Sequence, residues 1–182
     1  CPPEGIEALA KGGVIACLLP ATSFNLGATF APARDMVNAG VPVAMATDFN
    51  PGSCPCLNLQ FVINLGCLKY RLTPEEVLTA VTLNGAAAID MADKVGSVEP
   101  GKQGDLVIWD APDLDYICYR LGSNLVQTVI KRGEVIKLPI GAKNLTAGLD
   151  WAGNSGKLIA NLFFKEECNI NVKKNKACNI FF

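Results

Sequence analysis

Hydrophobic and polar residues follow two different periods over the first 95 positions. The spacing predicts helices over 3–11 and 31–38, each followed closely by glycine, and short apolar strands over 14–19 and 41–46. Strands that are apolar on both faces are typical of buried parallel sheets. The order helix, strand, helix, strand with short connections therefore predicts an α/β fold built from βα units.

Helical spacing resumes further along the chain. The stretch 57–70 predicts a helix with an apolar stripe formed by Leu57, Phe61, Leu65 and Leu68. Another helix begins after Thr73, because Thr73 and Glu76 have the spacing of a capping box. A helix of small residues is predicted over 84–91.

From residue 96 the pattern changes to turns and short strands. Apolar runs predict strands over 106–109, 126–130 and 134–136, and the last two flank a three-residue hairpin loop, 131–133. The tail from residue 143 has no clean period of either kind, although 158–164 is compatible with one strand. We expect a small β unit, followed by a tail that is foreign to the rest of the fold.

The strand over 41–46 leads into a carboxylate. Asp48 is followed at once by a turn rich in proline and glycine, 49–53. Ligands of parallel sheets bind beyond the carboxyl ends of the strands, which favours Asp48 as part of a functional site. The alternative is that Asp48 only caps the turn by bonding to its own backbone. Spacing alone leaves both interpretations open.

Composition narrows the class of protein. The 16 basic and 17 acidic residues give a net charge of −1, which provides no basic field for nucleic acid or anionic lipid. No apolar run reaches the ~20 residues that span a bilayer, and the first residues lack the features of a secretion signal. Phosphate-binding loops and nucleophile elbows do not occur. We expect a cytoplasmic protein without nucleic-acid or membrane partners.

Cysteine and histidine usage limits the metal chemistry. Cys17 and Cys67 lie within apolar segments, where a reduced thiol packs as a small hydrophobic group. Cys54 and Cys56 form a CxC pair with no second pair at ligand spacing, which argues against a zinc-thiolate site. The chain has no histidine, the commonest metal ligand and general base, so a hydrolytic metal centre would have to be completed from elsewhere.

Three segments carry a resemblance to a known family: the turn 47–53, the helical stretch 58–86 and the run 96–108. The first two look like the eighth-strand loop and following helices of the imidazolonepropionases, a family of metal-dependent amidohydrolases in histidine breakdown. The third is similar to a signature of the wider amidohydrolase superfamily, with Gly104 where alanine is usual. The resemblance covers about 3–136 and corresponds to the C-terminal third of the family's chain.

The resemblance implies a fold made of the C-terminal part of a (β/α)8 barrel plus strands of a small β-sandwich domain. Residues 1–95 would form the last two βα units and the helices after them. Residues 96–142 would form β-sandwich strands, and residues 143–182 an atypical tail.

The resemblance also implies site residues. Asp48 would be a ligand of zinc or iron and would exchange a proton with the attacking water. Asn50, Gly52 and Ser53 would contact the substrate, although turn chemistry also accounts for these residue types. The implied reaction is hydrolysis of 4-imidazolone-5-propanoate, a small-molecule substrate, to N-formimidoyl-L-glutamate. The intact family member is expected to be a homodimer.

One departure from the family changes the expectation for this chain. The family takes an HxH pair and a further histidine as metal ligands, and none is present. A catalytic zinc site takes about three protein ligands, so we expect the chain alone to bind no metal and to be inactive. Two alternatives stay open: another amidohydrolase, such as a cyclic-amidine or nucleobase deaminase, and a non-catalytic remnant.

Overall fold

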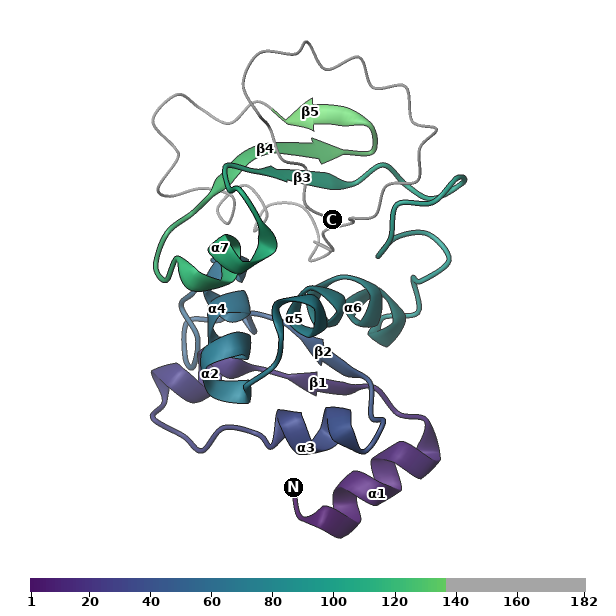
Figure 1. The fold of residues 1–182 in the computed structure, drawn as a ribbon, viewed down its shortest axis with the longest axis vertical. Coiled ribbons are helices and arrows are strands. Elements are labelled where there is room, and N and C mark those ends of the chain that lie inside the picture. The colour runs from purple at the N-terminus through teal and green to yellow at the C-terminus, as the bar shows by residue number, and fades with distance from the viewer. Residues whose placement is uncertain (137–182) are drawn as a thin grey trace.

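The structure is a computed structural model, and it describes residues 1–136 (Figure 1). The elements in chain order are α1 (Pro3–Gly12), β1 (Ala16–Leu18), α2 (Pro20–Asn25), α3 (Ala33–Asn38), β2 (Val43–Met45), α4 (Leu59–Tyr70), α5 (Pro74–Val81), α6 (Leu83–Ala88), β3 (Leu106–Trp109), α7 (Leu114–Tyr119), β4 (Val126–Lys131) and β5 (Glu134–Ile136). No helix within this range is long and apolar enough to cross a membrane.

β1 and β2 form a two-stranded parallel sheet, in register from the pair Ala16 and Val43 to the pair Leu18 and Met45. Every residue of β2 is buried, because the strand contacts α3, α5 and α6 (Figure 1). This confirms the predicted parallel strands. The prediction was wrong for Cys17, which is exposed on β1 because side chains alternate along a strand and its neighbours Ala16 and Leu18 take the buried face.

The two longer helices after β2 are α4 and α5, and both are capped as their sequences indicate. The residues of α4 that are buried differ from those predicted. Thr73 and Glu76 form the predicted capping box at the start of α5. Leu68, expected on an apolar stripe of α4, is 61% exposed. Gln60 and Asn64 are buried instead, and both donate hydrogen bonds to the Ile117 carbonyl oxygen. α7 packs on α4, so the face of α4 at that contact carries the polar side chains of Gln60 and Asn64 instead of a continuous apolar stripe.

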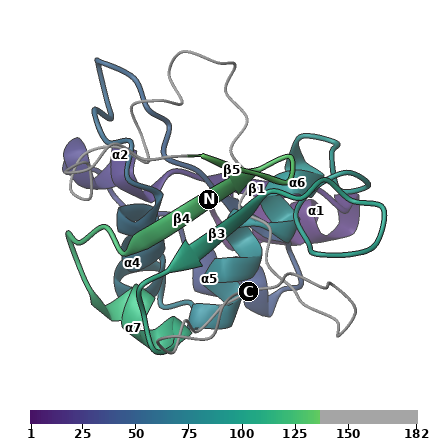
Figure 2. The same ribbon diagram turned by 90° about the horizontal axis from the view of Figure 1, so that it is seen from above.

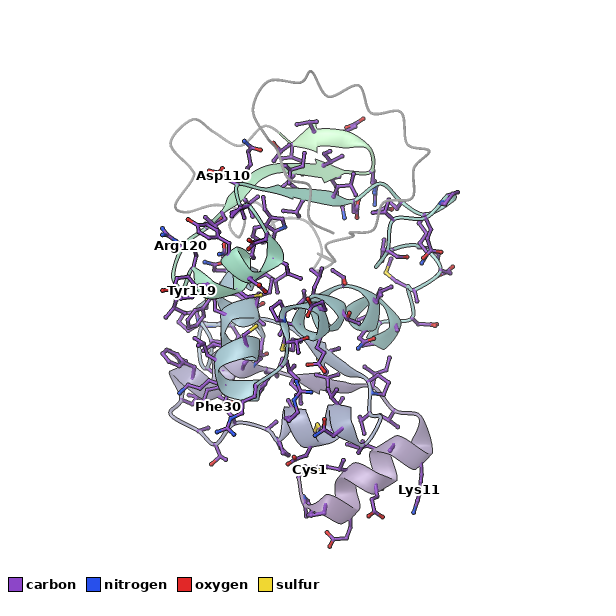
Figure 3. All side chains as sticks on the ribbon, in the orientation of Figure 1. Cys1, Lys11, Phe30, Asp110, Tyr119 and Arg120 are labelled. Carbon is purple, nitrogen blue, oxygen red and sulfur yellow. The ribbon has the colours of Figure 1, made fainter. Side chains whose placement is uncertain are left out.

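Two short helices, α2 and α7, were not predicted. Each has six residues. α7 begins after Asp113, whose carboxylate accepts from the backbone N–H of Tyr116. Figure 3 shows Tyr119 and Arg120 on the outer side of α7, and Tyr119 is 82% exposed.

β3, β4 and β5 form an antiparallel sheet that lies across the helical layer (Figure 2). The predicted hairpin is confirmed, but its loop has two residues rather than three, because Lys131 pairs with Glu134 in the sheet. The loop residues Arg132 and Gly133 have φ of 54° and 81°. Trp109 of β3 is 6% exposed and belongs to the same core as β1, β2 and their helices. The boundaries 1–95 and 96–142 stay a prediction. The predicted tail from 143 and its strand over 158–164 lie outside the described residues.

Candidate functional site

Asp48 lies three residues after β2 ends, and its backbone is unusual. Its φ is 54°, in the left-handed region that few residues other than glycine adopt and that aspartate tolerates better than most. The side chain is half-buried. One carboxylate oxygen, Oδ2, accepts a hydrogen bond from the Thr22 hydroxyl at 2.9 Å. The other oxygen, Oδ1, has no hydrogen-bond partner within residues 1–136.

The helix that follows β1 supplies the contacts around Asp48. β1 and β2 are parallel, so their carboxyl ends, and the segments after them, meet at one edge of the sheet. α2 therefore lies beside the turn that follows β2. Besides the Thr22 bond, the Asn25 carboxamide donates to the Ser53 carbonyl oxygen at 2.9 Å. The two ends of the turn are thus each bonded to α2.

Asn50 organises the turn from within. Its Oδ1 accepts from the backbone N–H of Gly52 at 3.0 Å and of Ser53 at 2.7 Å. Its Nδ2 donates to the Asp48 carbonyl oxygen at 2.7 Å and to the Ser53 hydroxyl at 2.8 Å. A backbone bridge between Asn50 and Cys54 closes the turn. The capping role considered for Asp48 is therefore filled by Asn50.

The structure brings all four predicted site residues into one turn, but it gives them different surroundings. Gly52 is exposed, so its backbone is open to a ligand, whereas Ser53 is half-buried with its hydroxyl on Asn50. Both amide hydrogens of Asn50 are already engaged in the turn. Substrate contact by Asn50, Gly52 and Ser53 stays a prediction.

A metal ion does not fit the described residues alone. Residues 1–136 contain no group of three or more His, Cys, Asp or Glu side chains that could hold one, and a catalytic zinc site takes about three protein ligands. Burial raises the pKa of the Cys56 thiol, and the neighbouring Cys54 acts in the same direction. The thiol is therefore protonated near neutral pH in the absence of a metal ion.

Thr22 and Asn25 are the polar contacts that the sequence interpretation missed. A signal for them was present, because the run Thr22 to Asn25 is polar apart from one aromatic residue and directly follows a strand and a proline. Two parallel strands place their carboxyl ends together, so polar residues after the first strand can reach those after the second. Thr22 and Asp48 are 26 positions apart in the sequence, so patterns among neighbouring residues could not indicate this contact.

Comparison with known proteins gives a consistent result. The model of the amidohydrolase family matches residues 2–143. The chain is 53% identical over 134 residues to an imidazolonepropionase from Alkaliphilus metalliredigens and 51% identical over 133 residues to one from Fusobacterium nucleatum. Each match covers 73% of this chain and 32% of the relative, so the chain spans about a third of the length of the curated relatives it matches.

Solved structures with a similar fold include two zinc-bound proteins. An adenosine deaminase from Xanthomonas campestris with bound zinc has a TM-score of 0.67 and 26% identity, over 78% of this chain and 38% of its own. An atrazine chlorohydrolase from Arthrobacter aurescens complexed with zinc has a TM-score of 0.66 and 25% identity, over 74% of this chain and 34% of its own.

Proposed function

The chain belongs to the amidohydrolase family, and on that premise we propose that it forms the C-terminal third of an imidazolonepropionase. The reaction would be hydrolysis of 4-imidazolone-5-propanoate, a cyclic amide, to N-formimidoyl-L-glutamate. The 53% identity over 134 residues carries the proposal. The chain is 26% identical to the zinc-bound adenosine deaminase, about half as much, so we do not propose the deaminase alternative.

In this proposal Asp48 is the catalytic acid–base group contributed by the chain. Its position beyond the carboxyl end of β2 is where parallel sheets bind ligands. The carboxylate would accept a proton from the attacking water and return it to the leaving nitrogen, which opens the ring. The free oxygen, Oδ1, is the atom available for this transfer, since Oδ2 is bonded to Thr22.

The turn after Asp48 would bind the substrate. The exposed Gly52 lets a planar ring or its propionate approach the backbone closely. The Ser53 hydroxyl can turn from Asn50 to a substrate oxygen, and Asn50 would then exchange one internal hydrogen bond for one to the substrate. Asn50 also keeps Gly52 and Ser53 in place, because it accepts from both backbone N–H groups.

We propose a bound divalent metal, zinc or iron, only for a larger assembly that includes this chain. Asp48 would be one ligand, and the remaining ligands would have to come from outside residues 1–136. We also propose a small-molecule substrate as the partner, a homodimer as the assembled form and the cytoplasm as the place of action, as expected for an enzyme of amino-acid breakdown.

A chimera tests the proposed function without depending on association in trans. The matched 134-residue segment of the Alkaliphilus metalliredigens enzyme would be replaced by the aligned segment of this chain. We expect the chimera to form N-formimidoyl-L-glutamate from 4-imidazolone-5-propanoate, as measured by mass spectrometry. The same protein should release no ammonia from adenosine or guanine.

Two outcomes would contradict the proposal. A folded chimera that leaves 4-imidazolone-5-propanoate intact would favour a non-catalytic remnant, and one that deaminates adenosine or guanine instead would favour the deaminase alternative. Metal analysis of the 182-residue chain alone gives an independent check. We expect no stoichiometric zinc or iron in it, because residues 1–136 offer no ligand cluster.

A further inference from the structure

We infer that Thr22 and Asn25 of α2 are positioning residues, which hold the Asp48 carboxylate and the turn after it in the orientation that the site uses. The structural part of this inference stands on the described contacts, and only its effect on turnover rests on the proposed function. Neither residue is among the buried residues of α2, which are Pro20 and Ala21.

Thr22 forms a hydrogen bond with one oxygen of the Asp48 carboxylate. A carboxylate rotates easily about its last torsion, so nothing in the side chain itself fixes the direction of its two oxygens. The hydroxyl of Thr22 donates to Oδ2 at 2.9 Å and leaves Oδ1 without a partner within residues 1–136. Because the two oxygens are equivalent, what Thr22 fixes is the orientation of the carboxylate plane, and hence the direction in which the second oxygen points.

The Asn25 contact fixes the far end of the same turn. Asn25 lies three residues after Thr22, which places both side chains on one face of α2. Its carboxamide donates to the Ser53 carbonyl oxygen at 2.9 Å, across 28 residues of sequence. Between these two bonds the turn is held together by Asn50, so it moves as one unit. α2 thus sets the position of that unit against the sheet.

Hydrogen exchange of the full 182-residue chain tests the positioning directly. The backbone N–H groups of Asn50, Gly52 and Ser53 are bonded within the turn and report its opening. We expect Thr22→Val or Asn25→Ala to speed exchange over 48–54 by about five- to tenfold, the factor for one lost hydrogen bond. Thr22→Ser, which keeps the hydroxyl, should restore the original rate.

A matched control separates positioning from general stability. Ser23→Ala removes a hydroxyl from the adjacent position of α2, where no side-chain bond to the turn exists among the described residues, and should leave exchange over 48–54 unchanged. Unaltered exchange in Thr22→Val would overturn the inference. So would an acceleration that extends equally to β1 and β2, or an absence of protection over 48–54 in the original chain.

Kinetics of the chimera provide a second readout. We expect Thr22→Val to lower kcat about 10- to 100-fold with little change in KM, because a misdirected carboxylate affects the chemical step. Asn25→Ala should chiefly raise KM, because it loosens the turn proposed to bind the substrate. Equal effects of Thr22→Val and Thr22→Ser on kcat would refute the role of the hydroxyl. If the unaltered chimera is inactive, the proposed function fails, and hydrogen exchange alone decides this inference.

Discussion

Asp48 and Asp105 both lie beside strands, but the two regions use their carboxylates in opposite ways. Asp105, 4% exposed, accepts from the Gln103 carboxamide, the Lys131 ammonium and the backbone N–H of Arg132. These bonds occupy both of its oxygens and tie β3 to the hairpin. Asp48 is half-buried, and within residues 1–136 its carboxylate has one neutral donor, Thr22, on one oxygen.

The difference distinguishes a carboxylate that builds the fold from one that is available for chemistry. A buried carboxylate with a cation and two further donors is satisfied, and its loss removes a hydrogen-bond acceptor from each of those donors. A half-buried carboxylate with one open oxygen contributes little to the fold, yet it can accept a proton. Substitutions at and near both sites can therefore separate stability from activity.

The largest effect is expected on catalysis from Asp48→Asn. Asparagine has nearly the same shape, adopts the left-handed backbone readily and can still accept from Thr22, so the fold should be unaffected. In an active chimera the loss of the proposed acid–base group should lower kcat about 10³-fold. Steady-state kinetics and urea unfolding measure the two properties separately. A large loss of stability with unchanged kcat would reverse the assignment.

The largest effect on stability is expected from Asp105→Ala. This substitution removes the acceptor of the Arg132 backbone N–H and one partner of the Lys131 ammonium, and we expect the free energy of unfolding in urea to fall by about 2 kcal/mol. Asp105→Asn keeps an acceptor for Arg132 and should cost less. If both variants unfold at the original urea concentration, Asp105 is not the structural carboxylate described here.

Arg34 and Glu76 form an intermediate case, a partly exposed ion pair between α3 and α5. Hydrogen bonding to Arg34 lowers the pKa of Glu76 below its ordinary value of 4.5. The pair therefore adds stability above pH 4.5 and loses it as pH falls through the lowered pKa of the folded state. Arg34→Met should reduce the free energy of unfolding at pH 7 and reduce it less at pH 3, where only the bonds from Arg34 to the Arg71 carbonyl oxygen would be lost.

The exposed pair of Lys11 and Glu7, 3.9 Å apart, supplies the control for this prediction. Lys11→Met should change stability very little at either pH, because exposed pairs are screened by solvent. Denaturant unfolding at several pH values would measure both variants. A pH-independent loss in Arg34→Met would mean that the bonds of Arg34 to the Arg71 carbonyl oxygen, rather than the charge of Glu76, stabilise the contact.

The smallest effect is expected beside Asp105, from Gly104→Ala. The φ of Gly104 is not in the left-handed region, and a Cβ there would meet the Gly133 nitrogen at 3.4 Å, an ordinary contact. The substitution should raise the free energy of unfolding by about 0.5 kcal/mol, since alanine restricts the unfolded chain. Gly96→Ala is the opposite case, because φ is 98° and a Cβ would lie 2.6 Å from that of Ala86. Thermal unfolding of both variants checks the pair.

Local signals in the sequence were enough for the elements that hold Asp48 and Asp105. β2 is a continuous apolar run, the capping box of α5 has a defined spacing, and the hairpin loop ends in glycine. Each of these depends on residues close together in the chain. The position of Asp48 at the end of β2 follows from the same local pattern, combined with the general behaviour of parallel sheets.

Contacts between distant segments could not be predicted in this way. Whether Cys17 is covered depends on what packs against β1, and the burial of Gln60 depends on α7, more than 50 residues further along. The role of Thr22 depends on the parallel pairing of two strands. Residue type alone does not distinguish the structural role of Asn50 from a role in substrate binding, since both use the same carboxamide.

The side chain of Asn84 on α6 donates to the Val43 carbonyl oxygen at 2.8 Å. In the register of the sheet, Pro42 and Ala46 bond toward β1, so Val43 directs its carbonyl to the opposite margin of β2. The Asn84 carboxamide occupies a hydrogen-bonding position on the edge of β2, where a strand of another chain could otherwise pair. It thereby protects an exposed strand edge of the kind through which sheet proteins aggregate. A strand that joins β2 on this side must either begin beyond Val43 or displace Asn84, so α6 helps to set the register of any further assembly.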